Sequence, residues 1–340
     1  MARKPIPFDH VIKALLDDST PFSPTYLHRF SDLEEDELDA LQQIWHQIQP
    51  TRRLALLSDL EENSDVDTLV FFDNVARIAL NDEHGAIRAQ AIRLLWASDD
   101  ENLIPLYLNF LSDPDAEVRA EAAGALGNFV YLGELEELPE NTLHQIEDRL
   151  IDLVRGKDET LVRRRALEAL GFSSRKEIPA LVREAYQTND PDWVASALLA
   201  MGRSYDKAYE PEVKRMLKHP KANVQLEAIR AAGELELESA RRTLLDLLEE
   251  EAQDSEIRYA VIWALSQIGG EQVRETLEKI ADETEDDEEL EIVEQALDNL
   301  QLNEEIPMMM FDFDIEDEEE LKKFGRQVDL SKPEEDDEED

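Results

Sequence analysis

Histidine and carboxylate side chains are the groups of this chain that could catalyse a reaction or bind a metal. The six histidines are His10, His28, His46, His84, His144 and His219. No two of them are three or four residues apart, the spacing that would place two metal ligands on one face of a helix. The 81 acidic residues form many carboxylate pairs by chance, and no pair stands out as a general acid and base. We therefore expect no catalytic residue and no metal ligand.

Other motifs that carry chemistry are also missing from the sequence. Cysteine is absent, which excludes thiol catalysis, disulfides and zinc–thiolate sites. Asp312, Asp314 and Glu316 alternate like the start of a calcium-binding loop. However, Asp317 replaces the glycine that such a loop requires, and Lys323 replaces its final glutamate. No glycine-rich phosphate loop occurs, and we expect no cofactor.

The charge balance indicates which partners the protein can bind. Of the 340 residues, 81 are acidic and 35 are basic, so the formal net charge is −46. Nucleic acids and anionic membranes would be repelled, whereas a basic protein or peptide would be attracted. The N-terminal stretch lacks an apolar signal-peptide core, and no run of about 18 apolar residues could span a membrane. We expect a cytoplasmic protein, monomeric by default, that binds a protein and neither nucleic acid nor membrane.

An internal repeat predicts the elements that position any binding residue. The segment VRAEAAGALG begins at Val118, and a close copy, VRRRALEALG, begins at Val162. Related segments begin at Ile87, Trp193, Val224 and Ile257. The first, fifth, eighth and ninth residues of each copy are apolar, which is the spacing of one face of an α-helix. Each copy therefore predicts one helix.

A second apolar segment precedes each copy and also reads as a helix. Pro105, Pro179 and Pro211 fall in the first turn of these helices, where a missing N–H group is tolerated. The tenth residue is glycine in four copies, which suits close packing between neighbouring helices. These glycines are Gly127, Gly171, Gly202 and Gly233. Each unit is therefore a helical hairpin, and because one hairpin cannot bury its apolar face alone, the units must stack.

The run D-P-D-x-x-V-R-x-x-A-x-x-A-L-G that begins at Asp113, with its copies, resembles the HEAT-repeat family. The repeats are similar to the short form of about 31 residues that is typical of phycobilisome lyases. The resemblance covers roughly residues 66–300 and implies an all-α, right-handed α–α superhelix. It implies a non-catalytic scaffold or adaptor, with an enzyme or enzyme accessory of the bilin-lyase type as the alternative. HEAT-type di-iron hydroxylases carry repeated His-Glu dyads, and this chain has no His-Glu dipeptide.

The chain divides into three segments. We expect residues 1–65 to form an N-terminal helical cap and residues 66–303 to form a HEAT-like solenoid of about seven helix pairs. Residues 304–340 contain 17 acidic and 4 basic residues, so we expect an acidic and mostly disordered tail. One interval between copies is 44 residues instead of 31 to 33. This difference indicates an insertion near residues 131–143, either a projecting loop or an extra turn of helix.

Arginine recurs at the second position of four copies, as Arg88, Arg119, Arg163 and Arg258. Recurrence at one position of a repeat is typical of packing between repeats. We therefore expect a ladder in which these arginines pair with acidic residues of the turns, such as Asp113 and Asp158.

The residues predicted to bind a partner lie beside the buried stripe of the second helix in each pair. Toward the C-terminus this surface becomes aromatic, and aromatic and arginine side chains dominate interface energies. The predicted protein-binding residues are Leu226, Tyr259, Trp263, Arg230 and Arg164, together with Phe311 and Phe313 of the tail. The alternative for the first set is packing between repeats. The segment at residues 308–315 either packs on the last repeat or acts as a short docking motif. A further hypothesis is that the tail folds over the groove and competes with a ligand.

Overall fold

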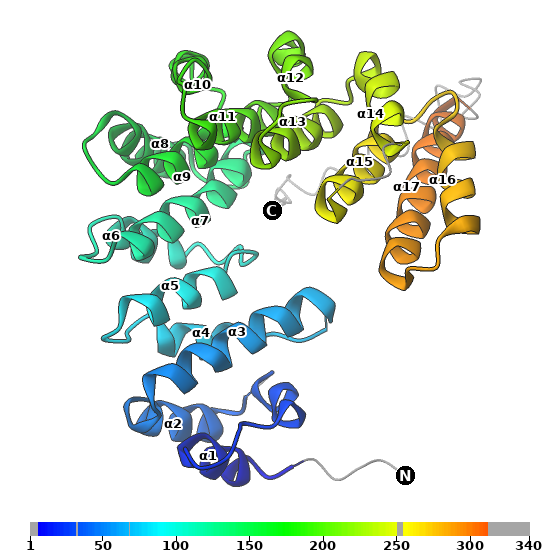
Figure 1. Ribbon diagram of the computed structural model, residues 1–340. Helices are drawn as coiled ribbons and strands as arrows, with labels where there is room; N and C mark the ends of the chain where they lie inside the picture. Colours follow the sequence, from blue (N-terminus) through cyan, green and yellow to red (C-terminus); the bar gives the residue numbers. More distant parts are fainter. Residues whose placement is uncertain (1–5, 32, 68, 250–253, 312–340) are drawn as a thin grey trace, which may run out of the picture.

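The computed structural model describes residues 6–31, 33–67, 69–249 and 254–311, and the regular elements over these ranges are helices (Figure 1). The N-terminal part consists of α1 (Phe8–Leu16), η1 (Pro24–Phe30), α2 (Glu35–Ile44), η2 (Trp45–Gln47) and α3 (Pro50–Val66). Trp45 is buried, and its indole N–H donates a hydrogen bond to Asp82 at 2.8 Å. This bond joins the N-terminal part to the hairpin that follows it.

Seven helical hairpins follow within the described ranges, each with an outer and an inner helix. The outer helices are α4 (Asp73–Ala79), α6 (Leu103–Phe110), α8 (Glu140–Arg155), α10 (Ile178–Tyr186), α12 (Glu210–Met216), α14 (Arg241–Leu248) and α16 (Val273–Glu283). The inner helices are α5 (Gly85–Leu94), α7 (Ala116–Glu134), α9 (Thr160–Ala169), α11 (Pro191–Arg203), α13 (Ala222–Glu234), α15 (Ser255–Ile268) and α17 (Asp287–Phe311). Successive inner helices pack on one another, and α3 packs on α5. The fold is an all-α solenoid, as the repeat predicts.

The hairpins stack into an arch, with the inner helices along its concave side and the outer helices along its convex side (Figure 1). An outer helix of opposite direction precedes each inner helix, so the inner helices run parallel. Their C-terminal ends meet at one edge of the concave face, which we call the C-terminal edge, and their N-terminal ends meet at the N-terminal edge. Among the described residues, no helix combines the length and the apolar character needed to cross a membrane.

Glycine and alanine set the close spacing of the inner helices. The glycines at the tenth position of four copies each face the alanine at the eighth position of the next copy. A methyl group on any of these glycines would lie 2.8–3.1 Å from the Cα atom of that alanine. This is closer than van der Waals contact allows, so a larger residue would push two repeats apart. The glycine–alanine pairs are Gly127 with Ala169, Gly171 with Ala200, Gly202 with Ala231 and Gly233 with Ala264.

The predicted arginine ladder is present at three of its four positions, along the N-terminal edge. The pairs are Arg88 with Asp113 at 2.7 Å, Arg119 with Asp158 at 2.7 Å, and Arg258 with Glu289. Arg88 and Arg119 also donate to a backbone carbonyl oxygen of the turn that precedes their own helix. Arg258 donates to the carbonyl oxygen of Leu248, at the end of α14. The ladder therefore fixes both the turn within a hairpin and the contact with the next hairpin.

The expectation of an acidic partner was wrong for Arg163. Its Nε and Nη2 both donate to the carbonyl oxygen of Val154 at 3.0 Å. Its guanidinium lies 5.2 Å from the ring centroid of Trp193, which begins the next copy. The aromatic ring thus replaces the carboxylate that the neighbouring copies offer.

The insertion near residues 131–143 lengthens two helices. Helix α7 has 19 residues and α8 has 16, and a short turn joins them. The predicted boundary at residue 303 falls inside α17, which continues to Phe311. The rest of the predicted tail, including Phe313, lies outside the described residues.

Candidate partner-binding face

Two hollows open on the concave face. The first hollow has a volume of about 510 Å³ and is lined by residues of α3, α5, α7, α9 and α11, of the short 3-10 helix after α9, and of the turns after α5 and α11. The second hollow has a volume of about 640 Å³ and is lined mainly by residues of α11, α13, α15 and α17. The side chains of Phe172, Arg203 and Tyr205 line both hollows and separate them.

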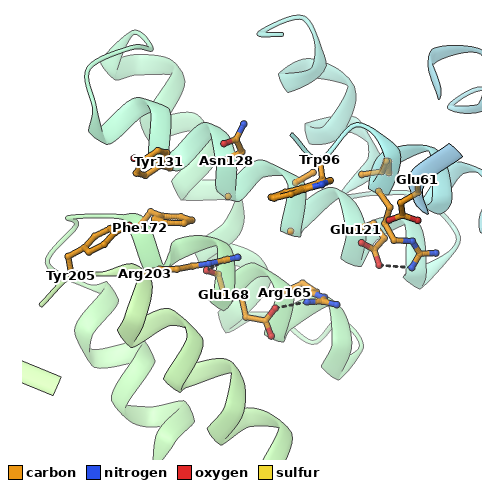
Figure 2. A pocket seen from close by; sticks show the side chains of 15 residues that line it. Glu61, Trp96, Glu121, Asn128, Tyr131, Arg165, Glu168, Phe172, Arg203 and Tyr205 are labelled. Atoms are coloured by element: carbon orange, nitrogen blue, oxygen red, sulfur yellow. Dashed lines mark hydrogen bonds and ion pairs between the residues drawn. The ribbon is translucent and has the colours of Figure 1, made fainter. Parts of the chain in front are cut away.

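Aromatic side chains form the end of the first hollow nearest the C-terminal edge (Figure 2). Trp96 is 65% exposed, Tyr205 57% and Tyr131 36%, although all three are large and largely apolar. The rings of Tyr131 and Phe172 lie 5.2 Å apart in a tilted arrangement. Exposed aromatic side chains that gather in a concave site are typical of a surface that binds another molecule.

Charged side chains form the other end of the first hollow, and they are paired with one another. Arg93 Nη1 lies 3.2 Å from Glu121 Oε1, and Arg165 Nη1 lies 2.9 Å from Glu168 Oε2. Burial raises the pKa of Glu121, although Arg93 and Arg165 oppose this shift. Figure 2 shows these pairs beside one another, away from Tyr131 and Tyr205. Glu61 also lines this end and accepts a hydrogen bond from Gln90, so the end carries three carboxylates and two arginines.

Arg203 stands between the two hollows without an ion-pair partner among the described residues. Its Nη1 donates to the carbonyl oxygen of Glu168 at 2.9 Å, and its guanidinium lies 5.0 Å from the ring centroid of Phe172. Burial lowers the pKa of Arg203, because the charged form is partly withdrawn from water. The stack of Arg203 on Phe172 shows that this face already uses an aromatic ring to hold a cation.

The structure brings together three of the residues predicted to bind a partner. Arg230, Tyr259 and Trp263 all line the second hollow, together with Leu199. Arg230 is held by Glu227 at 3.0 Å and by Glu256 at 3.3 Å. Tyr259 and Trp263 lie one turn apart on α15 and are half-buried.

The other predicted residues lie elsewhere. Leu226 is 9% exposed within the core, and Arg164 pairs with Asp192 at 2.9 Å on the N-terminal edge; neither lines a hollow described above. The backbone of Phe311 is helical, and Phe313 lies outside the described residues.

The aromatic end of the first hollow was not foreseen from the sequence. Trp96, Tyr131, Phe172 and Tyr205 lie at or just beyond the end of the ten-residue segment that defines the repeat, so the helical periodicity of that segment does not reach them. Tyr131 belongs to the insertion that lengthens α7. The sequence did contain a signal for this end, namely an aromatic residue that follows the last apolar residue of the repeat segment in four successive copies.

Both edges of the concave face carry acidic residues with and without ion pairs. On the N-terminal edge, Asp115, Asp190 and Asp254 cap helices, and others pair with the arginine ladder. On the C-terminal edge, Asp100, Glu177 and Glu236 form ion pairs, whereas Asp99 and Glu134 form none with a described residue. Asp99 accepts a hydrogen bond from Asn128 at 2.9 Å, and Glu134 accepts one from the Ser174 amide at 2.6 Å. Negative charge without a counterion therefore adjoins the aromatic end of the first hollow.

Comparison with solved structures finds other helical-repeat chains at low sequence identity. YibA of Escherichia coli is 18% identical, with a TM-score of 0.42 over 84% of this chain and 98% of that one. Human deoxyhypusine hydroxylase is 16% identical, with a TM-score of 0.35 over 77% of this chain and 95% of that one. Importin beta is 13% identical, with a TM-score of 0.42 over 86% of this chain and 46% of that one. No curated protein matches the sequence.

A sequence profile of HEAT repeats matches residues 74–140 and 210–298. The matched ranges contain α4 to α7 and α12 to α16, and the copies that begin at Val162 and Trp193 lie between them. The profile describes HEAT repeats in general and does not single out the phycobilisome-lyase type. The repeat, the stacked hairpins and the profile agree that the chain is a HEAT-repeat protein.

Proposed function

We propose that this protein is a cytoplasmic, non-catalytic scaffold that holds a basic protein along its concave face. The observation that carries this proposal is the exposure of Trp96, Tyr131 and Tyr205 at one end of a hollow on that face. Burying a fully exposed side chain of this size contributes about 1.5–3 kcal/mol, and a bound partner would recover the share of this that corresponds to the exposed area.

The second support is charge. Residues 1–303 keep a net charge of −33, so the acidity belongs to the solenoid as well as to the tail. Asp99 and Glu134, which form no ion pair with a described residue, are held near the aromatic residues by hydrogen bonds to Asn128 and to the Ser174 amide. A basic protein would approach this side faster, because opposite charges steer the encounter.

The test compares the full chain with the double variant Trp96→Ala/Tyr205→Ala in affinity capture from an extract of the source organism, at low and moderate salt. The matched control is Phe71→Ala, which removes an aromatic side chain that is 61% exposed and lines neither hollow. The recovered partner is then titrated against all three proteins. We expect the double variant to bind about tenfold or more weakly and the control to bind like the parent. Equal affinity for the double variant would contradict the proposal.

A further inference from the structure

Gly124 differs from the other glycines of the inner helices. Gly127, Gly171, Gly202 and Gly233 each touch the next repeat, so packing explains them. A methyl group on Gly124 would meet no atom within 4 Å. Glycine in the interior of a helix weakens that helix relative to alanine, and packing does not require it at this position.

The space above Gly124 belongs to the first hollow. Gly124, Ala125 and Asn128 of α7 line this hollow between its charged and its aromatic ends. Any long side chain at position 124 would project into the hollow, because nothing else occupies that space. The glycine therefore leaves this part of the hollow open.

The chemistry around this part of the hollow favours a cation. Exposed aromatic faces bind ammonium and guanidinium groups, and Arg203 already lies over Phe172 in this way. Asp99 and Glu134 do not line the hollow, but they accept hydrogen bonds from Asn128 of its lining and from the Ser174 amide, and neither forms an ion pair with a described residue. Arg93 and Arg165 are paired with Glu121 and Glu168. The charge of Arg203 is offset by the nearby carboxylates of Glu168, Glu227 and Glu234.

We propose that the space over Gly124 receives a lysine or arginine side chain from an extended segment of the partner. Trp96, Tyr131 and Tyr205 contact the aliphatic stem and the face of the cation, and the carboxylates of Asp99 and Glu134 balance its charge. This inference rests on the proposed function and specifies which part of the concave face selects the basic partner.

The test titrates the full chain with a labelled peptide of alternating lysine and glycine, at an ionic strength of about 0.15 M to screen non-specific attraction. Gly124→Ala is expected to bind like the parent, whereas Gly124→Phe fills the hollow and is expected to bind about tenfold more weakly. Trp96→Ala, which changes an exposed side chain and leaves the core intact, is expected to bind about threefold more weakly. The same peptide with acetylated lysines is expected not to bind.

The possible outcomes separate the two proposals. If the lysine peptide binds the parent, Gly124→Phe and Trp96→Ala equally, the hollow is not the site, while binding of a basic partner elsewhere on the concave face stands. If the parent does not bind the lysine peptide at all, the basic partner of the proposed function is contradicted as well. If a peptide with the acidic-aromatic sequence of residues 311–316 binds through Gly124 and the lysine peptide does not, the hollow selects an anion and the inference is overturned.

Discussion

At the scale of single residues, glycine has two opposite uses on the inner helices. Gly233 is required by packing, because a methyl group there would lie 2.9 Å from Ala264 Cα and 2.6 Å from the ring of Trp263. Gly124 faces open space. Substitution by alanine must therefore have opposite effects on stability at the two sites.

We predict that Gly124→Ala raises the free energy of unfolding by about 0.5–1 kcal/mol, because alanine is the better helix former. We predict that Gly233→Ala lowers it by about 1–3 kcal/mol, because the extra methyl group overpacks the contact with α15. Chemical denaturation of both variants checks this pair. A loss of stability in Gly124→Ala would show that the space above Gly124 is filled in the folded protein.

A buried carboxylate gives a prediction for pH. Glu147 of α8 is fully buried, one of its oxygens accepts a hydrogen bond from Ser173, and its other oxygen has no hydrogen-bond partner. Burial raises the pKa of Glu147, against the opposing effects of Ser173 and Arg175. The folded state therefore holds this proton more tightly than the unfolded chain, so this group's contribution to stability falls as pH rises from its unfolded pKa through its folded pKa.

We expect Glu147→Gln to be more stable than the parent at pH 7 by about 1 kcal/mol, because the amide keeps an acceptor for Ser173 and carries no charge. The difference should shrink as the pH falls toward the ordinary glutamate pKa of about 4.3, where the parent carboxyl is protonated too. Thermal unfolding across this range provides the measurement. A difference that grows toward low pH would show that the pKa of Glu147 is not raised in the folded state.

At the scale of helices, the repeat could be predicted from the sequence because every hairpin makes the same contacts with the next one. Position-specific glycine and alanine, and the arginine at the second position, follow from contacts that every hairpin makes with the next. The aromatic end of the first hollow could not be predicted in the same way. Trp96 and Tyr205 lie in turns after their helices, where no periodicity constrains the chain, and Tyr131 is placed by an insertion that occurs once.

The arginine ladder gives the prediction at this scale. Arg119→Ala removes hydrogen bonds to Asp158 and to the Asp113 carbonyl oxygen and leaves a partly buried carboxylate without its counterion. We expect it to lower the free energy of unfolding by about 1–3 kcal/mol. Arg242→Ala serves as the control, because that side chain is 84% exposed and its pair with Asp246 should contribute less than about 0.5 kcal/mol. Equal effects in the two variants would show that the ladder does not stabilise the stack.

At the scale of the whole molecule, charge and shape act together. The arch offers a long concave face, and the net charge of −46 surrounds it with a field that attracts cations. Arg93 and Arg165 of the first hollow are already paired with Glu121 and Glu168, so specificity there must come from aromatic contacts. Long-range attraction should therefore govern the rate of association, and short-range contacts should govern the lifetime of the complex.

We predict that the association rate constant for a basic partner falls about tenfold or more when the ionic strength is raised from about 0.02 M to about 0.5 M, because the Debye length shortens. The dissociation rate constant should change far less. Trp96→Ala should show the reverse pattern, with faster dissociation and an almost unchanged association rate. Stopped-flow kinetics separates the two rate constants, and a variant that slows association alone would contradict this division of roles.

The most direct test of the central claim maps the side of the arch that the partner touches. A photo-crosslinking amino acid is placed at Tyr131 or Tyr259 on the concave face, and in a matched protein at Leu106 of the outer helix α6, which is 42% exposed. Irradiation of the complex is predicted to yield partner adducts at positions 131 and 259 and none at position 106. Adducts at position 106, with none at the two concave positions, would show that the partner binds the convex side and would contradict the account.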